Sequence, residues 1–321
     1  MPKDPIKKAL GKLKKLRAEG ATDETLEQLR HMLSTEAGFV VANIAALLSE
    51  WYAADLARDL EAAFFRLDKN GFEDDPQCWG KLGVIKALHE LAWQDGAVYL
   101  AACRCQQFEP VYGGQEDSAI SVRIAATQAL VQLPMVNTHT VLEALADLLA
   151  DPSAKVRKEA ARASVRCPAD VVYPLLRLKI RLGDKDARVT GTCFDALLAL
   201  MPTLESVNLV KTYTGANDVL QIEALASLAS SSIDEAVESA LEHYAHFTDK
   251  QLKRLLITAL GSSQSQTALN FLFEKLGCAP PEEATWALEA VRHKLHDEDI
   301  LLHVKTSLDQ RHDDWHPDLD L

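Results

Sequence analysis

Apolar and small residues recur along this chain with the spacing of a helix face. In the segment that starts at Val156, apolar or small side chains stand at offsets 0, 4, 7 and 8, which fall on one stripe of an α-helix. Val122 and Val189 start segments with the same spacing, and further segments follow it less strictly. The stripes begin at positions 39, 80, 122, 156, 189, 220, 252 and 283. The pattern predicts a series of amphipathic helices that each bury one stripe.

The residue at offset 7 of each stripe is small and returns at regular distances. It is Ala or Ser at positions 46, 87, 129, 163, 196, 227, 259 and 290, with seven successive intervals between 31 and 42 residues. A small side chain at this point lets paired helices approach closely, so we expect Ala163 and Ala259 to be buried. A period in this range is typical of an array of helical repeats.

Aspartate and proline keep the same period. An aspartate stands five residues before four of the stripes, where a carboxylate can accept the free amide hydrogens of a helix N-terminus. These aspartates are Asp75, Asp117, Asp151 and Asp184. Pro134, Pro168 and Pro202 follow stripe helices at intervals of 34 residues, where one helix ends and the next begins. Each stripe helix is therefore expected to have a partner helix before it.

The expected helices can be placed along the chain. A partner helix precedes its stripe helix in the pairs 138–149 with 153–166 and 233–245 with 248–261. Extra helices at about 3–18 and 297–310 would cap the two ends of the array, as a solenoid requires. The longer early intervals predict two longer loops, near 67–76 and 107–118, and the second has the glycines and proline of turns.

The chain resembles the HEAT-repeat family, of the PBS-lyase HEAT-like type, in the strings at 117–129 and 151–163. Both have the order Asp-x4-Val-Arg-x2-Ala-x2-Ala, and a third string at 184–197 has Thr190 in place of the arginine. The resemblance covers roughly residues 35–294. It implies an all-α fold, an α-solenoid of about eight helix pairs with capping helices at both ends. Solenoids of this kind offer a long concave face to protein partners.

The sequence contains no flexible linker, so we expect one continuous solenoid over residues 1–311. Residues 1–34 would hold a basic helix and the first partner helix, residues 35–294 the repeats, and residues 295–311 a C-terminal cap. Residues 312–321 form an acidic tail that we expect to be disordered. A docking peptide and a loose metal site are the alternatives for this tail.

Composition and charge narrow the class of protein. Hydrophobic residues make up 48% of the chain, which is ample for a buried core, and the net charge is −13. A strongly acidic surface repels phosphate backbones, so nucleic acid is not expected as a partner. The six cysteines include no CxxC pair, and no apolar stretch is long enough to span a bilayer. We therefore expect a cytoplasmic protein with reduced thiols and no stable membrane insertion.

The residues that could carry chemistry give little support to a catalytic centre. His89-Glu90 is a single His-Glu dyad, whereas HEAT-like deoxyhypusine hydroxylases hold two irons with several such dyads, and the other repeats of this chain offer none. The segment 68–75 is similar to a calcium loop, but its glycine comes too early and no glutamate stands at the twelfth position. Gly-rich phosphate loops, GxSxG elbows and HExxH motifs are absent from the sequence. No catalytic residue, metal ligand or cofactor is expected.

Two basic segments lie in this acidic chain. Residues 1–20 carry seven bases against two acids, on a helix whose apolar face suits a capping helix or, alternatively, a membrane-surface helix. Residues 152–188 carry ten bases against four acids. The repeating aspartates could form a ladder of ion pairs with arginines of neighbouring repeats. Such an Asp–Arg ladder would account for Arg157 but not for bases that lie off the apolar stripe. The candidate partner-binding residues on the concave face are therefore Lys86, Lys158, Arg162 and Arg166.

The leading hypothesis is a protein-binding scaffold or adaptor that takes an acidic segment of a protein partner on this concave face. The alternative is an enzyme or enzyme subunit similar to the bilin lyases of phycobilisome assembly, which the repeats resemble. A third hypothesis is a DNA-binding or DNA-repair protein similar to the HEAT-like alkylpurine glycosylases. The net charge of −13 disfavours this third hypothesis.

Overall fold

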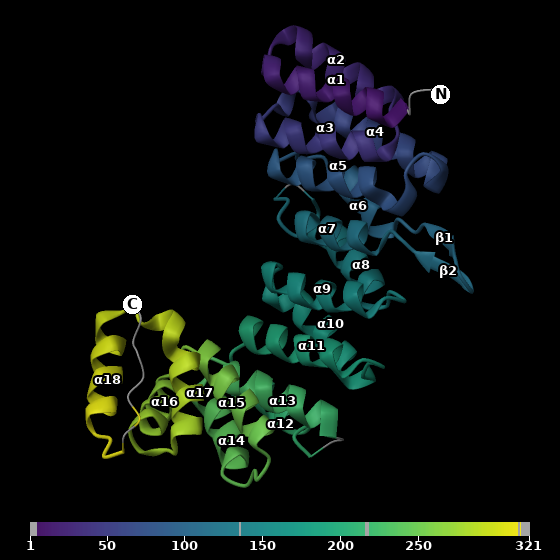
Figure 1. The fold of residues 1–321 in the computed structure, drawn as a ribbon. Coiled ribbons are helices and arrows are strands. Elements are labelled where there is room, and N and C mark those ends of the chain that lie inside the picture. Colours follow the sequence, from purple (N-terminus) through teal and green to yellow (C-terminus); the bar gives the residue numbers. More distant parts are fainter. Residues whose placement is uncertain (1–4, 135, 216–217, 314, 316–321) are drawn as a thin grey trace. The chain divides into compact units, whose positions relative to one another are not determined.

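The chain folds into helices that follow one another in pairs. The computed structural model describes residues 5–134, 136–215, 218–313 and 315. Over these residues it contains eighteen α-helices and one two-stranded β-hairpin, so the all-α fold expected from the sequence is confirmed (Figure 1). None of the described helices is long and apolar enough to cross a membrane. The helices form two compact units, residues 1–167 and residues 168–321, and each unit is considered by itself.

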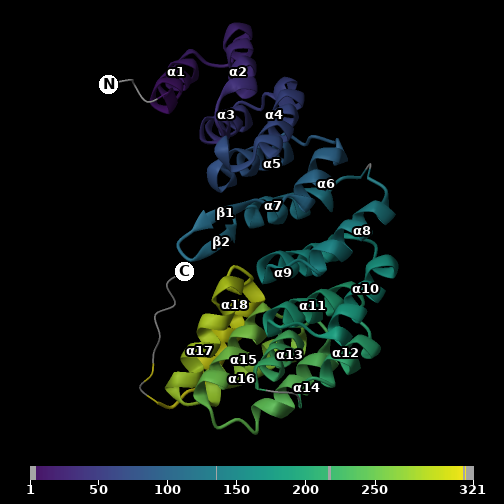
Figure 2. The ribbon, with the colours of Figure 1, turned by 90° about the vertical axis from the view of Figure 1, so that its right-hand side faces the viewer.

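Unit 1 is built from two layers of helices and a short hairpin that projects from one side (Figure 1). Its elements are α1 (Pro5–Glu19), α2 (Asp23–Thr35), α3 (Gly38–Glu50), η1 (Ala54–Leu56), α4 (Ala57–Asn70), η2 (Gly71–Glu73), η3 (Pro76–Cys78), α5 (Trp79–Glu90), α6 (Gly96–Arg104), β1 (Phe108–Val111), β2 (Gly114–Asp117), α7 (Ile120–Leu130), α8 (Thr138–Leu149), α9 (Ala154–Ala163) and η4 (Ser164–Arg166). The stripe helices α3, α5, α7 and α9 pack side by side (Figure 2). The partner helices α2, α4, α6 and α8 form the second layer.

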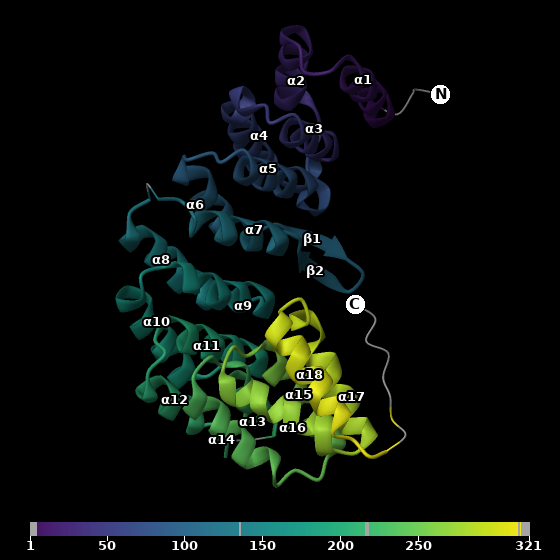
Figure 3. The same cartoon turned by 90° about the vertical axis from the view of Figure 1, so that its left-hand side faces the viewer.

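Unit 2 repeats this arrangement. Its elements are α10 (Ala169–Leu182), α11 (Ala187–Leu200), α12 (Leu204–Lys211), α13 (Asp218–Ser230), α14 (Asp234–Tyr244), α15 (Lys250–Ser262), α16 (Gln266–Cys278), α17 (Pro281–Val291), η5 (Arg292–Lys294) and α18 (Glu298–Asp309). The stripe helices α11, α13, α15 and α17 are neighbours in one layer (Figure 3). The helices α12, α14, α16 and α18 follow one another in the other layer.

The stripes that the sequence predicts form the core of both units. From the second stripe onward, the side chains at offsets 4 and 8 are buried. Ala163 is buried as expected, at 5% exposed. Ala259 is only half-buried, because Gly261 makes the close approach in its place. A side-chain carbon at Gly261 would come within 2.5 Å of the backbone oxygen of Ala290 on α17.

The first stripe is shifted by one residue from the expected register. Phe39, Asn43 and Ala46 are exposed. The buried residues stand one position later, at Val40, Ile44, Leu47 and Leu48. The cause is the close packing of α3 on α5, where a side-chain carbon at Gly80 would come within 2.6 Å of the Cα atom of Gly38. This contact turns Gly38 rather than Phe39 toward α5, and the rest of the helix rotates with it.

The helix boundaries agree closely with the expected ones. The expected helix 138–149 coincides with α8, and the range 153–166 is covered by α9 and η4. The helices α14 and α15 begin and end within two residues of their expected ranges. The expected capping helices are present as α1 and α18. Apolar spacing is a local signal, and it therefore locates helices well.

The segment 107–118, expected as a loop, contains a β-hairpin instead. Strands β1 and β2 are antiparallel, with Phe108 opposite Asp117 and Val111 opposite Gly114. Gly113 in the turn has a φ of +89°, which residues with a side chain rarely adopt. The turn was indicated by the sequence, but strands of four residues are too short to produce a clear alternation. The other expected loop, near 67–76, holds the end of α4 and the turn η2.

The repeating aspartates fix the turns between helices in two ways. Asp75 is fully buried and accepts the amide hydrogens of Gly80 and Lys81 at 2.7 and 3.0 Å, so its predicted role as a helix cap is confirmed. The others each accept the amide hydrogen two residues further on, before the helix begins: Asp117, Asp151 and Asp184. For these three the predicted role as a helix cap is wrong. The aspartate side chain is short, and it accepts an amide hydrogen of the turn before the helix and not one of the helix itself.

The expected boundaries of the solenoid, residues 1–34, 35–294 and 295–311, remain a prediction. Only part of the acidic tail 312–321 falls within the described residues, which include 312, 313 and 315. Trp315 is half-buried, and the guanidinium carbon of Arg311 lies 4.7 Å from the centre of its ring. The beginning of the tail therefore has a contact with the residues just before it.

Candidate functional site

A hollow opens on the stripe-helix layer of unit 1, at the C-terminal ends of α5, α7 and α9. Its volume is about 670 Å³, within the range of about 300–1,000 Å³ that is usual for ligand pockets. The residues that line it, which define the basic hollow, are His89, Gln128, Val131, Gln132, Glu159, Arg162, Ala163, Val165 and Arg166. Three neighbouring repeats contribute to this one site.

The repeat explains why these residues meet. Counted from the start of its own stripe, Gln128 and Arg162 both stand at offset 6. Offsets 9 and 10 supply most of the others, namely His89, Val131, Val165, Gln132 and Arg166. Equivalent positions on stacked helices lie side by side, so one offset forms one row across the layer. The row at offset 6 contains Arg162. The rows at offsets 9 and 10 contain the other residues named above, so these two rows are the feature of the sequence that would have located them.

Arg162 is oriented by a nearly buried carboxylate. Its Nη1 atom lies 3.0 Å from Oε2 of Glu159, one turn earlier on α9. The side chain of Glu159 is 9% exposed and also accepts a hydrogen bond of 2.9 Å from the amide of Gln128 on α7. The side chain of Arg162 remains 63% exposed. Its guanidinium is thus held in place and still open to an acidic group from solvent.

Arg166 gives the hollow an excess positive charge, because the one carboxylate of the lining, Glu159, pairs with Arg162. It is exposed, and it has no ion-pair partner among the residues that the structure describes. Val165 beside it is 42% exposed and adds an apolar surface. From the ends of α5 and α7, Nε2 of His89 and Nε2 of Gln132 lie 3.5 Å apart. The hollow therefore combines excess positive charge with apolar and amide groups.

The structure brings together two of the four predicted site residues. Arg162 and Arg166 line the basic hollow, whereas Lys86 and Lys158 are not among its lining residues. Lys86 is exposed on α5, and Lys158 is half-buried one turn before Arg162 on α9. The hollow lies at the C-terminal ends of the helices, so the base one turn earlier falls outside it. The binding role predicted for all four residues is therefore carried into the proposal below for Arg162 and Arg166 alone.

The Asp–Arg ladder expected between repeats is present in unit 1. The buried guanidinium of Arg123 lies 2.8 Å from carboxylate oxygens of both Asp117 and Asp151, and it donates to the backbone oxygen of Cys105. Although burial opposes it, the hydrogen bond from Arg123 holds the pKa of Asp117 below its ordinary value. Arg157 donates to the backbone oxygen of Asp151 at 2.7 Å. Both arginines serve the fold.

A second buried polar cluster surrounds Lys81 on α5. Its side chain is 1% exposed, and its ammonium donates to Gln107 at 2.6 Å and lies 3.6 Å from Asp68. Burial raises the pKa of the Cys105 thiol to about 12, so this thiol stays protonated at neutral pH. Within the described residues, no group of three or more His, Cys, Asp or Glu side chains is placed to hold a metal ion. The carboxylate of Asp68, in the segment similar to a calcium loop, accepts a hydrogen bond from the Cys105 thiol at 3.2 Å and pairs with Lys81.

Unit 2 has a hollow at the equivalent ends of its stripe helices, with different chemistry. Its volume is about 410 Å³, and it lies at the C-terminal ends of α11, α13 and α15. Small and polar side chains line it: Asp195, Leu198, Ala199, Ser227, Ser230, Ser231, Ser232, Ser262 and Gln264. These lining residues include no lysine or arginine. The row at offset 10 thus holds Arg166 in the hollow of unit 1 and Ser230 and Ser262 in that of unit 2.

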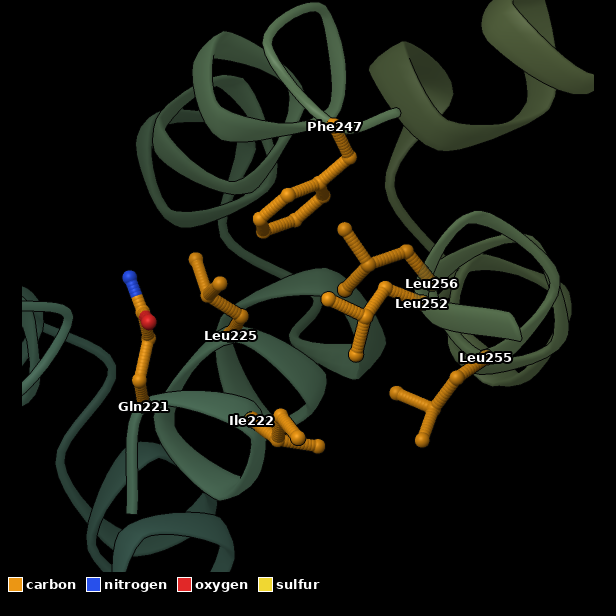
Figure 4. Close-up of a pocket in the computed structure, with 7 residues that line it drawn as sticks. All are labelled: Gln221, Ile222, Leu225, Phe247, Leu252, Leu255 and Leu256. Atoms are coloured by element: carbon orange, nitrogen blue, oxygen red, sulfur yellow. The ribbon is translucent and has the colours of Figure 1, made fainter. Parts of the chain in front are cut away.

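A smaller, apolar pocket lies between α13 and α15 (Figure 4). Figure 4 shows the ring of Phe247 directed into the space between Leu225 and Leu256. The lining residues are Gln221, Ile222, Leu225, Phe247, Leu252, Leu255 and Leu256. Its volume is about 80 Å³, well below the usual size of a ligand pocket. The basic hollow is therefore the stronger candidate for a binding site.

No protein-family model matches the chain, and no curated protein matches it in sequence. Among solved structures, a similar one is the complex of CpcE and CpcF of phycocyanin lyase from Nostoc sp. PCC7120. The two chains share 16% sequence identity, the TM-score is 0.42, and the match covers 76% of this chain and 93% of that chain. Function therefore rests on the chemistry of the site's own residues.

Proposed function

We propose that this protein is a binding scaffold or adaptor, built from HEAT-like helix pairs, that takes an acidic segment of a protein partner into the basic hollow. One observation carries the proposal. Arg162 and Arg166, which come from a run of ten bases against four acids, line one hollow of about 670 Å³. A cytoplasmic location, without a cofactor, belongs to the same proposal.

The lining of the hollow selects the chemistry of its occupant. A guanidinium group binds a carboxylate through two parallel N–H donors, and the hollow offers two such groups. Val131 and Val165 add apolar surface beside them. A short segment that carries acidic and apolar side chains would use both features. A long nucleic acid would bring the same negative charge, but the net charge of −13 on the protein opposes it.

The contacts in the hollow are partly exposed to solvent, which sets their strength. Charged groups that remain solvated contribute modestly and are screened by salt over about 8 Å at physiological ionic strength. We therefore expect the association to weaken as the salt concentration rises. Electrostatic complementarity of this kind contributes to the choice of partner and to the association rate.

The proposal is tested by a pull-down from the native organism with three baits. The first is the wild-type chain, and the second carries Arg162→Glu and Arg166→Glu. The third carries Lys155→Glu and Lys158→Glu, which change the charge of the same helix by the same amount outside the hollow. We expect a protein that the wild-type and the lysine variant retain and the arginine variant loses. An identical set of proteins on all three baits, with equal helicity, would overturn the proposal.

The bilin lyase alternative predicts a different result for the same protein. A lyase would attach a bilin covalently to its acceptor apoprotein, and the absorbance spectrum of the bilin would shift. Attachment by the wild-type chain would replace the scaffold proposal. Binding of a partner without attachment would leave the scaffold proposal in place.

A further inference from the structure

Helix α1 presents two chemically different faces. Ala9, Leu13 and Leu16 are buried, and the helix packs on α2 and α3 at one end of unit 1 (Figure 3). The exposed remainder of the helix carries five lysines: Lys7, Lys8, Lys12, Lys14 and Lys15. At 100° per residue, four of them lie on the side opposite the buried residues, and Lys12 lies beside the buried face. The helix thus caps unit 1, as the sequence predicts, and its outward side remains a basic surface.

The outward side of α1 has small residues along its middle and lysines along its edges, so the helix can lie flat on a planar surface. At 100° per residue, Gly11 and Ala18 stand near the middle of this side. Lysines form a row along each edge, Lys7 with Lys14 on one and Lys8 with Lys15 on the other. Nothing lies within 4 Å of the point where a side-chain carbon at Gly11 would stand. The small residues in the middle let the helix backbone come close to a plane while lysines on both edges reach it.

The charge of this face is not balanced within the protein. None of the five lysines forms an ion pair with another residue of the described ranges, although the chain has a net charge of −13. Arg17, near the end of the same helix, does pair, at 2.6 Å from Glu50. The lysines are therefore available to a negatively charged surface outside the protein.

We propose that the outward face of α1 binds an anionic membrane surface, with the helix lying flat on the lipid headgroups. Clusters of four to eight basic residues are attracted to anionic lipids by charge alone. The apolar face of α1 is already buried in unit 1, so the association is electrostatic and reversible and needs no insertion. The helix contains no aromatic residue on which a base could stack, which favours a membrane over a single-stranded nucleic acid.

The test is cosedimentation of the full chain with phosphatidylcholine vesicles that do or do not contain phosphatidylserine, at low and high salt. Loss of one lysine near an anionic surface lowers the partition coefficient about fivefold. The variant Lys7→Glu, Lys8→Glu and Lys15→Glu should therefore bind at least about 100-fold more weakly. The matched control, Lys185→Glu, Lys211→Glu and Lys305→Glu, makes the same charge change at exposed lysines of unit 2 and should bind as the wild-type does.

Three results would overturn the proposal. They are equal binding to vesicles with and without phosphatidylserine, equal binding of the α1 variant and the wild-type, and tighter binding of a DNA duplex than of the anionic vesicles. Circular dichroism of the α1 variant confirms that it folds, and the neutral variant Lys7→Gln, Lys8→Gln and Lys15→Gln repeats the test with a smaller charge change. The Arg162→Glu and Arg166→Glu variant should keep its vesicle binding, because it acts on a separate site.

Discussion

The two units join their repeats with different side chains. In unit 1, the buried guanidinium of Arg123 lies between Asp117 and Asp151, which belong to successive repeats. In unit 2, the hydroxyl of Ser263 donates to the backbone oxygen of Ser231, and the ammonium of Lys294 donates to the backbone oxygen of Ser263. Positions 231, 263 and 294 are one repeat apart. Between these residues the connection is a buried ion pair in unit 1 and a bond from a side chain to the backbone in unit 2.

The two units also differ in the length of their repeats, which are longer in unit 1. The intervals between the small stripe residues are 34 to 42 residues within unit 1 and 31 or 32 within unit 2. The additional residues of unit 1 include η2, η3 and the hairpin, whose turns supply polar partners for Lys81 and Arg123. A buried charge is tolerated only with such partners. The comparison indicates that the additional turns of the longer repeat supply the partners that its buried charges need.

The largest effect expected from this comparison is in unit 1. Arg123→Ala leaves the carboxylates of Asp117 and Asp151 without their shared partner in the interior. Removal of one member of a buried ion pair costs about 3–5 kcal/mol. We expect a large loss of hydrogen-exchange protection in α7 and α9, measured by mass spectrometry. The exposed pair of Arg177 and Glu205 serves as the control, since Arg177→Ala should leave the protection of its neighbours nearly unchanged.

A smaller effect is expected from the close helix contact in unit 2. Gly261→Val places a side chain against the Ala290 backbone, which stands 2.5 Å from the first added carbon. Overpacking of this kind costs about 1–3 kcal/mol. The protection of α15 and α17 should fall while that of unit 1 is retained. Gly11→Ala, at a glycine with open space around it, should not destabilise the protein. Equal protection in Gly261→Val and the wild-type would contradict the close contact.

The hydroxyl connection of unit 2 should be worth less than the ion pairs of unit 1. Ser263→Ala removes the hydrogen bond to the backbone oxygen of Ser231 and the one that the hydroxyl accepts from the amide of Ser265, at a cost of about 1 kcal/mol each. Ser230→Ala, whose hydroxyl bonds only within its own helix, is the matched control. The two variants can be compared by thermal unfolding. A loss for Ser263→Ala as large as that for Arg123→Ala would remove the distinction between the two kinds of connection.

The ion pairs of unit 1 also predict a pH dependence that the serine connection cannot produce. The pKa of Asp117 is lowered in the folded state, so its contribution to stability is present above the ordinary carboxyl pKa of about 3.9 and is lost as the pH falls below it. The protection of α7 should therefore decline in acid. Asp117→Asn should lower protection at neutral pH and reduce this decline. An unchanged acid profile in Asp117→Asn would show that the pair does not govern the transition.

The sequence predicts the repeat well because its signal is local. Apolar spacing within one helix locates the stripes from position 80 onward and the bounds of α8. The first stripe is wrong by one residue, because the rotation of α3 depends on the contact of Gly38 with Gly80, two residues far apart in the chain. Such a contact leaves no mark in the spacing of either helix alone.

The candidate site is predicted in part for a related reason. Charge along the sequence indicates Arg162 and Arg166, but it also selects Lys86 and Lys158, which the hollow does not include. The position of the hollow along the helices depends on how three repeats stack. The sequence singles out His89 only as half of the His89-Glu90 dyad, and its place in the hollow follows from the row at offset 9.

The most direct measurement of the central claim is a calorimetric titration of the partner's acidic segment into three forms of the protein, at low and high salt. The forms are the wild-type, Arg166→Glu and Lys158→Glu, of which only the first variant changes the lining of the basic hollow. We predict that Arg166→Glu weakens binding about tenfold, or about 1.4 kcal/mol, and flattens the salt dependence. Lys158→Glu should bind as the wild-type does. Equal affinity and equal salt dependence of Arg166→Glu and the wild-type, both folded, would contradict binding in the basic hollow.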